Sequence, residues 1–420
     1  MRTDTVRTLI LSARRALRSC ALLAISTAAS SAGFAATIAR EPGDPFSFSL
    51  SEQITSDENI YRLPDDLDVT TMIPASDASR DDLVSRTSAV VDGSWDLGKQ
   101  ELALNLAVDN NRYADNTMLN NTAGNGRVDW NWQLASDWSG QLGAGYGRSL
   151  AGFVNSRFLG KDLLESSDYH GAVRYELTPH WSLSAKGRYG QGEHDTDARQ
   201  IDNFDSRSHT FAINYLTRRG DELGFQYRRT ATSFPNQQSV GGLFTDHGYV
   251  DRAASLELQY AFTVKTSFQG SMGYLWRHYP QSVIGDFAGP VWNVGLRWEP
   301  RSKTRVEISQ FQELTAFLDA ESNHFKARGT RLTLGWLPTS KITLSLAASR
   351  EKHDYTGFDL LELNGPGRRD RVGNWQVGLS YTPVQMLSFD VNYRFEQRDT
   401  NRLLYEYDDR VISAGLTLTF

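Results

Sequence analysis

The sequence contains little cysteine, few long apolar runs and no excess of positive charge. Its only cysteine is Cys20, so no disulfide braces the rest of the chain and its rigidity must have another source. No run of 18 or more apolar residues follows the first forty positions, and mean hydropathy is −0.46, which excludes a helical membrane protein. A transmembrane barrel is not excluded, because alternating strands average to a polar hydropathy.

The formal net charge is −6, so no basic field would attract nucleic acid, and we expect no nucleic-acid partner. Aromatic side chains are abundant, with 10 Trp, 17 Tyr and 20 Phe in 420 residues. That length by itself would suggest two or three domains. The patterns described below instead predict one large domain.

The N-terminus predicts a secretory signal peptide over residues 1–35. Five arginines precede the apolar run Ala21–Ile25, and small residues around Ala35 suit signal-peptidase cleavage. Cys20 lies before the apolar run, which is a poor position for lipoprotein processing, and we expect it to be incidental. Residues 36–44 are expected to form a short periplasmic lead.

The rest of the chain, residues 45–420, shows a regular alternation of strands, tight turns and longer polar loops. Strands of about ten to thirteen residues are long enough to cross a bilayer when tilted. Tight turns are predicted at 97–99, 135–137, 178–180, 218–221, 263–264, 300–302, 338–340 and 383–385. Long connections are predicted near 113–124, 150–165, 192–205, 233–249, 278–288, 314–325, 352–369 and 398–407.

This rhythm predicts an all-β fold, an antiparallel up-and-down transmembrane barrel of the Gram-negative outer membrane. We count about eighteen strands, from one near Pro45–Ile54 to one ending at Phe420. Sixteen strands are possible if the hairpin around Val306 and Leu332 is misread. The period of about forty residues is also known from propeller blades, but each period here holds two long strands rather than four short ones.

Apolar side chains occupy one parity of each predicted strand, as in the set Leu102, Leu104, Leu106 and Val108. Many such sets end in an aromatic residue next to a turn: Trp95, Trp132, Trp138, Trp181, Trp298, Trp336 and Tyr381. The aromatic belts of membrane barrels predict this position, whereas a soluble core would place aromatics at any height.

Charged and amide side chains occupy the opposite parity, which predicts that they face the lumen. The candidate lumen-lining residues are Arg174, Arg188, Arg228, Arg297, Arg305, Arg331, Arg394, Glu176, Glu257 and Asp390. The plainer interpretation is a wetted wall of cross-strand ion pairs. The alternative is an arginine track for an anionic or sugar-rich ligand.

We expect no catalytic residue, no metal and no cofactor. No Gly-flanked nucleophile turn, metal-binding histidine pair, P-loop or dinucleotide motif occurs in the sequence. Several histidines lie in or near the long loops: His194, His247, His278, His324 and His353. They could form a metal site, but no pair has the spacing of a known motif, and we expect solvated loop residues.

The final segment, Arg410–Phe420, places Leu416, Leu418 and Phe420 on one parity and small polar residues on the other. It resembles the C-terminal strand of bacterial outer-membrane barrels, whose terminal Phe is read by the barrel-assembly machinery. The resemblance implies that these three residues form an assembly signal. We expect this strand to pair back to the Phe46 strand and so close the sheet.

Five short stretches resemble the EpsL-like proteins of exopolysaccharide operons, grouped with the beta-barrel porin 2 family. They are Pro45–Leu50 followed by Asp57–Pro64, Asn110–Tyr113, and Asp129–Trp132 followed by Trp138–Gly143. The resemblance implies a porin-like barrel that serves export of an exopolysaccharide or passive solute passage. Its partners would be outer-membrane lipid and lipopolysaccharide, the exported polysaccharide and periplasmic export components. The alternative is a structural barrel whose extracellular loops bind polysaccharide, lipopolysaccharide or an assembly partner.

Overall fold

The computed structural model describes residues 45–73, 78–156, 158–237, 248–280, 286–316, 324–356 and 367–420. Internal contacts divide the chain into two units, Met1–Gly33 and Phe34–Phe420. The expected signal peptide and periplasmic lead lie outside the described residues and stay predictions. No helix in the described ranges is long and apolar enough to cross a membrane.

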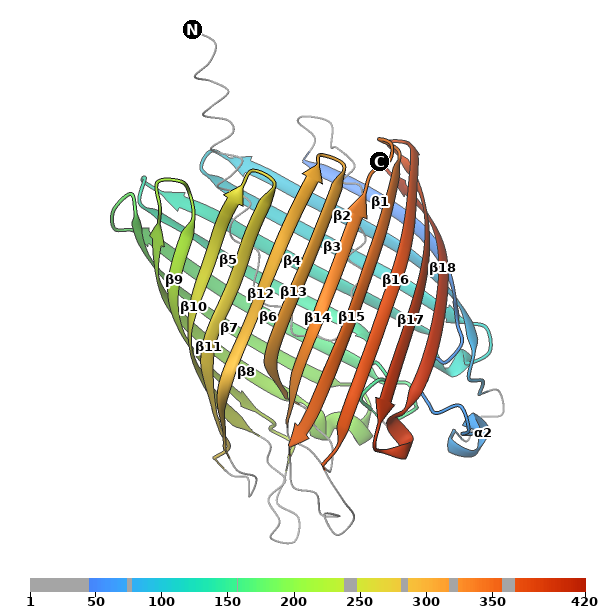
Figure 1. Ribbon diagram of the computed structural model, residues 1–420. Coiled ribbons are helices and arrows are strands. Elements are labelled where there is room, and N and C mark those ends of the chain that lie inside the picture. The colour runs from blue at the N-terminus through green and yellow to red at the C-terminus, as the bar shows by residue number, and fades with distance from the viewer. Residues whose placement is uncertain are drawn as a thin grey trace. The chain divides into compact units, whose positions relative to one another are not determined.

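Eighteen strands form a single sheet (Figure 1). In chain order they are β1 (Phe46–Asp57), β2 (Asp82–Leu97), β3 (Gln100–Tyr113), β4 (Asn121–Leu134), β5 (Trp138–Leu150), β6 (Leu163–Glu176), β7 (Trp181–His194), β8 (Phe204–Leu216), β9 (Glu222–Ser233), β10 (Tyr249–Thr263), β11 (Thr266–His278), β12 (Phe287–Arg301), β13 (Thr304–Ala316), β14 (His324–Trp336), β15 (Ile342–Thr356), β16 (Arg369–Val384), β17 (Leu387–Thr400) and β18 (Tyr407–Thr419). Short helices lie in the long connections: α2 (Val69–Met72), η1 (Thr117–Leu119), η2 (Asp197–Asp202) and η4 (Leu403–Tyr405).

The sheet closes on itself. Each strand pairs antiparallel with the next, and β18 pairs with β1, with Leu418 opposite Leu50. Two further backbone hydrogen bonds extend this seam: Phe48 N donates to Phe420 O at 3.1 Å, and Phe420 N donates to Phe48 O at 2.8 Å. The predicted closed barrel of eighteen strands is confirmed, and β13 and β14, the hairpin that left sixteen possible, are both present.

Short and long connections alternate along the chain as predicted. All eight predicted tight turns separate consecutive strands, from β2–β3 to β16–β17. Gly98 and Gly220 adopt φ of 70° and 89° in two of these turns, a left-handed conformation that glycine adopts without steric cost. Ala135, with φ 55°, takes the same conformation in the β4–β5 turn. The nine longer connections, from β1–β2 to β17–β18, leave and rejoin the sheet at the other end of the barrel, which we call the mouth.

The outer face of the barrel is apolar and exposed. Large side chains that a soluble protein would bury stand open, such as Leu106 at 45%, Phe211 at 61% and Leu256 at 56% exposure. Aromatic residues beside the tight turns are exposed as well, including Trp298 at 49% and Trp336 at 45%. An apolar band with an aromatic girdle is the surface that a barrel presents to lipid.

The seam yields the first testable prediction. Phe420→Ala should lower the amount of folded barrel in the outer membrane several-fold and leave secretion to the periplasm intact. The change removes the ring that stacks on Phe48, with centroids 6.3 Å apart, at the strand that closes the sheet. Folded and unfolded forms are separated by heat-modifiable migration of outer-membrane fractions on SDS gels.

Phe262→Ala is the matched control, because Phe262 is an equally exposed ring (53%) at the end of β10, away from the seam. We expect it to assemble normally. Equal losses for both variants would show that the seam aromatic has no special role in assembly.

Candidate functional site at the inner wall and mouth of the barrel

The ten predicted lumen-lining residues all occupy strand positions that alternate with the exposed apolar side chains of the outer face. Side chains alternate across a strand, so these positions face inward in a closed barrel. They are Arg174 and Glu176 on β6, Arg188 on β7, Arg228 on β9, Glu257 on β10, Arg297 on β12, Arg305 on β13, Arg331 on β14, and Asp390 and Arg394 on β17. That they line a solute path stays a prediction.

Most of the predicted arginines are held in ion pairs. Arg174 contacts Glu176 at 2.8 Å and Glu222 at 3.4 Å, Arg188 contacts Asp168, Arg297 contacts Glu307 at 2.6 Å, Arg305 contacts Glu299 at 2.9 Å, Arg331 contacts Glu351 at 3.1 Å, and Arg394 contacts Asp409 at 3.9 Å. Arg228 lies within electrostatic range of Glu257, and Asp390 accepts a hydrogen bond from Ser388 at 3.4 Å. These contacts favour the wall of cross-strand ion pairs over a single arginine track.

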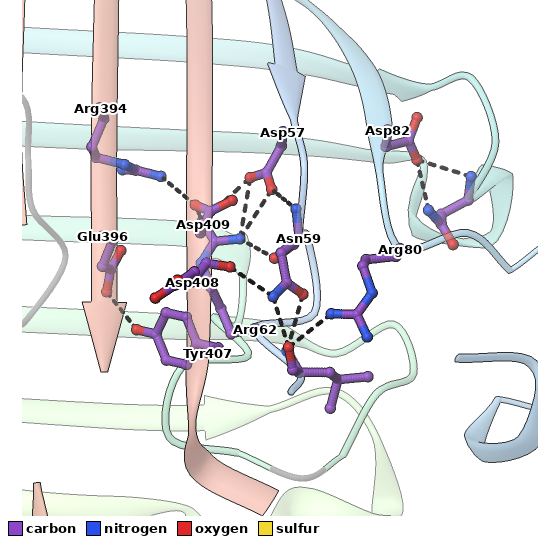
Figure 2. Close-up of polar contacts among 12 residues, drawn as sticks. Asp57, Asn59, Arg62, Arg80, Asp82, Arg394, Glu396, Tyr407, Asp408 and Asp409 are labelled. Carbon is purple, nitrogen blue, oxygen red and sulfur yellow. Dashed lines mark hydrogen bonds and ion pairs between the residues drawn. The ribbon is translucent and has the colours of Figure 1, made fainter. Parts of the chain in front are cut away.

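A buried polar site lies at the mouth, where the connection after β1 meets the inner wall (Figure 2). Arg62 contacts Asp57 at 3.1 Å and Asp409 at 2.8 Å, and the Asp409 side chain is fully buried. Arg394 approaches Asp409 from β17. Burial opposes the charged form of Arg62, but the carboxylates of Asp57, Asp409 and Glu396 outweigh it and hold the pKa of Arg62 above its ordinary value. We call Asp57, Arg62, Arg394 and Asp409 the mouth cluster.

Asn59 fixes the path of the backbone around the mouth cluster. Its side-chain amide donates to Leu63 O at 2.7 Å and to Asp408 O at 2.9 Å, and its side-chain oxygen accepts from Leu63 N at 3.0 Å. Arg62 adopts φ 56°, a strained conformation for a side chain of its size. Asn59 and Arg62 both belong to the Asp57–Pro64 stretch that carried the resemblance, so its polar residues serve to clamp the β1–β2 connection onto β18.

The β5–β6 connection crosses the mouth. Arg398, which faces inward near the end of β17, donates to Val154 O at 2.8 Å and to Asn155 Oδ1 at 3.1 Å. The strands between β17 and β5 are β18, β1, β2, β3 and β4. A contact between such distant strands cannot run along the rim of the wall, so this connection reaches across the inside of the barrel.

A small apolar core supports the crossing connection. It joins three connections, β1–β2, β3–β4 and β5–β6, through the buried residues Tyr61, Leu63, Val69, Ile73, Leu119, Phe153 and Leu159. The rings of Tyr61 and Phe153 meet edge to face with centroids 5.0 Å apart. From the far side, Arg199 of η2 donates to Ser156. The mouth is therefore an organised structure and is narrowed by packed side chains.

Sequence reasoning missed the mouth cluster except Arg394, and it missed Arg398. The only available signal was the order of residue types in Asp57–Pro64, which identifies a loop without showing what it contacts. The partner of Arg62 lies 347 positions away in β18, at a separation no local pattern can reveal.

The loop histidines that the structure describes form no shared metal site. His194 contacts Asp162 at 2.7 Å and His278 contacts Asp286 at 2.8 Å, while His247 lies outside the described residues. The expectation of solvated side chains is wrong for His324, 1% exposed, and His353, 6% exposed, because aromatic rings from neighbouring segments cover them. In the part of the chain that the structure describes, no three His, Cys, Asp or Glu side chains are placed to hold a metal ion.

Comparisons with known proteins agree with this architecture. Residues 254–420 match the model of the family described as Putative beta-barrel porin 2. No curated protein matches the chain. The structure of a BenF-like porin from Pseudomonas fluorescens Pf-5 is similar with a TM-score of 0.50 at 8% identity, over 90% of this chain and 99% of that one. OccK2 (OpdF) of Pseudomonas aeruginosa, solved in complex with glucuronate, is similar with a TM-score of 0.50 at 8% identity, over 89% and 98%.

At 8% identity the two structures show the shared fold. Together with the family model, which covers the wall from within β10 to the end of β18, they identify a porin-like β-barrel of the outer membrane. The exposed apolar outer face gives a physical reason for this membrane location, because lipid covers such a surface at low free-energy cost.

The mouth cluster yields a second prediction. Arg62→Met should lower the free energy of unfolding by about 3 kcal/mol, because it leaves the buried carboxylate of Asp409 without its closest partner. Urea unfolding in lipid vesicles, followed by tryptophan fluorescence, measures the change. The double variant Arg62→Met/Asp409→Asn should recover much of the loss, since the unpaired charge is gone.

Arg410→Met is the matched control. Arg410 pairs with Glu58 at 3.3 Å, but both side chains are 57% exposed, and exposed pairs contribute at most about 1 kcal/mol. A loss for Arg410→Met as large as that for Arg62→Met would contradict the importance given to burial.

Proposed function

We propose that this protein conducts hydrophilic solutes across the outer membrane through the barrel lumen. The observation that carries the proposal is the inner wall of arginines, carboxylates and amides inside a closed eighteen-stranded sheet. Barrels of this strand number leave an aqueous space in the interior. Such a wall offers water and polar solutes hydrogen-bonding partners of both signs along the whole crossing.

The β5–β6 connection sets the narrowest part of this path in our proposal. It is held to β17 by Arg398 and to η2 by Arg199, so a solute must pass beside it. The ion pairs of the mouth cluster are largely buried, whereas those of the wall, such as Arg297–Glu307, are substantially exposed. Exposed charges interact with a passing solute. The mouth cluster instead holds the β1–β2 connection, against which the β5–β6 connection packs through Tyr61 and Phe153.

A finer proposal is that the solute is an exopolysaccharide leaving the cell. It rests on the resemblance of Asp57–Pro64 and the other quoted stretches to EpsL-like proteins and on the polar wall. A polymer needs a wider path than a small solute, so export would require the β5–β6 connection to move. The polar anchors of this connection are side-chain contacts and include no strand pairing. The connection could therefore move while the sheet of the barrel stays closed on itself.

A second candidate function is a structural barrel whose long connections bind polysaccharide, lipopolysaccharide or an assembly partner. The packed core of the β1–β2, β3–β4 and β5–β6 connections favours it, because it gives the mouth a firm surface. The two functions differ in one measurable property, the current that the purified protein passes.

Planar-bilayer recording gives the third prediction. We expect single-channel currents from the wild type and several-fold larger conductance when residues 152–161 are replaced by an Asn-Gly turn. The replacement is compatible with the hairpin because Ala151 N donates to Asp162 O at 2.8 Å, so the two ends already lie together. Arg398→Met, which removes the anchor on β17, should give larger and more variable currents.

Arg410→Met serves again as control, since Arg410 points outward on β18, and its conductance should equal that of the wild type. If neither the wild type nor the shortened variant passes current, the channel proposal is refuted. Current from the shortened variant alone would show a lumen closed by the connection and would favour the second function.

The export proposal is tested in cells. Deleting the gene should shift polysaccharide from the medium to the cell-bound fraction, and wild-type protein should restore it. Export would be refuted if polysaccharide release were unchanged both after deletion of the gene and in the Arg398→Met variant. That outcome would leave the channel proposal intact.

A further inference from the structure

Strands β14, β15 and β16 are neighbours in the wall (Figure 1). Their outward parity carries a basic surface near the mouth. These strands expose apolar side chains over the rest of their outward face, such as Trp336 and Val377. Continuing the same parity toward the mouth reaches Lys326 and Arg328 on β14, Arg350 and Lys352 on β15, and Arg369 and Arg371 on β16. We call these six residues the β14–β16 basic rim.

The strand register places cations directly beside one another. Arg328 is opposite Lys352, and Lys352 is opposite Arg371, so one row across three strands consists of three positive side chains. Arg350 occupies the next row toward the membrane, and Arg369 the next row away from it. Side chains directly opposite across strands have Cβ atoms roughly 5 Å apart, and like charges at that distance destabilise a sheet.

Carboxylates offset only part of this repulsion. Asp354 pairs with Arg328 at 2.8 Å and is opposite Lys326 and Arg369 in the strand register, and Asp399 is opposite Arg371. Within the described ranges, Lys326, Arg350, Lys352, Arg369 and Arg371 form no ion pair. The whole chain is acidic, with a formal net charge of −6, so the basic rim is a local departure from its composition. The inner wall, by contrast, pairs most of its arginines.

The basic rim lies at the edge of the lipid-facing band. From Ile342, at the start of β15, to Lys352 is about ten residues, which at ~3.3 Å per residue and ~45° tilt is roughly 23 Å of height. The apolar band of an outer-membrane barrel is about 25 Å tall. The row of Arg328, Lys352 and Arg371 therefore stands where lipid headgroups begin, on the side of the long connections.

We propose that the β14–β16 basic rim binds the phosphate groups of a glycolipid of the outer leaflet, the lipid A part of lipopolysaccharide. Guanidinium groups bind phosphate oxygens in a bidentate fork, and clusters of four to eight basic residues at a membrane edge recognise anionic headgroups. A phosphate above this row neutralises side chains that otherwise repel one another. The acyl chains then lie along the apolar side chains of the same three strands. This site faces lipid and is independent of the lumen.

The test compares two variants of equal charge change. Arg350→Gln/Lys352→Gln/Arg371→Gln removes three cations from the basic rim. Arg218→Gln/Lys265→Gln/Arg301→Gln removes three exposed cations from the tight turns at the opposite end. Native mass spectrometry of detergent-solubilised protein with bisphosphorylated lipid A should show about tenfold or greater loss of bound lipid for the first variant only.

Thermal unfolding adds a readout that a purely structural role would not give. Without lipid the rim variant should be at least as stable as the wild type, because repulsion is relieved. With bisphosphorylated lipid A the wild type and the turn variant should gain stability, and the rim variant should gain little. Equal lipid-induced stabilisation of all three proteins overturns the proposal.

Two further arms identify the source of the phosphate. Dephosphorylated lipid A should bind the wild type far more weakly, and equal binding would mean that the acyl chains alone are recognised. Millimolar inorganic phosphate should not displace lipid A. Complete displacement would reduce the basic rim to a site for free phosphate and would overturn the assignment to a lipid.

Discussion

The structure depends on backbone hydrogen bonding in a medium without water. Every unsatisfied N–H or C=O costs several kcal/mol in lipid, so a membrane-spanning sheet must close. The seam between β1 and β18 achieves this, and the pairs Phe48–Phe420 and Leu50–Leu418 show that it continues to the tight-turn end. An even strand number follows from that closure in an antiparallel chain, and the alternating strand direction places every second connection, here the long ones, at the mouth.

Most of the fold could be predicted from the sequence because the signals are local. Strand alternation has a period of two, and tight turns reveal themselves by residue type, so parity and strand number followed without knowledge of contacts. Burial at the mouth could not be predicted in this way. His324 and His353 read as solvated loop residues, yet Tyr279, Phe287 and Phe325 cover them from other segments.

In the candidate site, too, local patterns predicted some features and could not predict others. All ten wall residues were placed on the inward parity from alternation alone, but their partners depend on register and side-chain reach. Arg174 reaches Glu222 on β9, three strands away, and the Arg62–Asp409 pair joins opposite ends of the sequence. A stretch such as Asp57–Pro64 can mark a family resemblance while its hydrogen bonds remain invisible until the chain is folded.

The wall of the barrel and the β5–β6 connection are held by different kinds of interaction. The wall is therefore the stable part of the fold, and the connection is the part that could move. Strand pairing secures the wall, so opening it would break many backbone bonds at once. The β5–β6 connection is fixed by the side chains of Arg398 and Arg199 and by the packing of Phe153 on Tyr61. Those contacts can be exchanged for water or solute one at a time, because the mouth borders an aqueous lumen. In the channel that we propose, exchange of these contacts would change the width of the path without any change in the sheet.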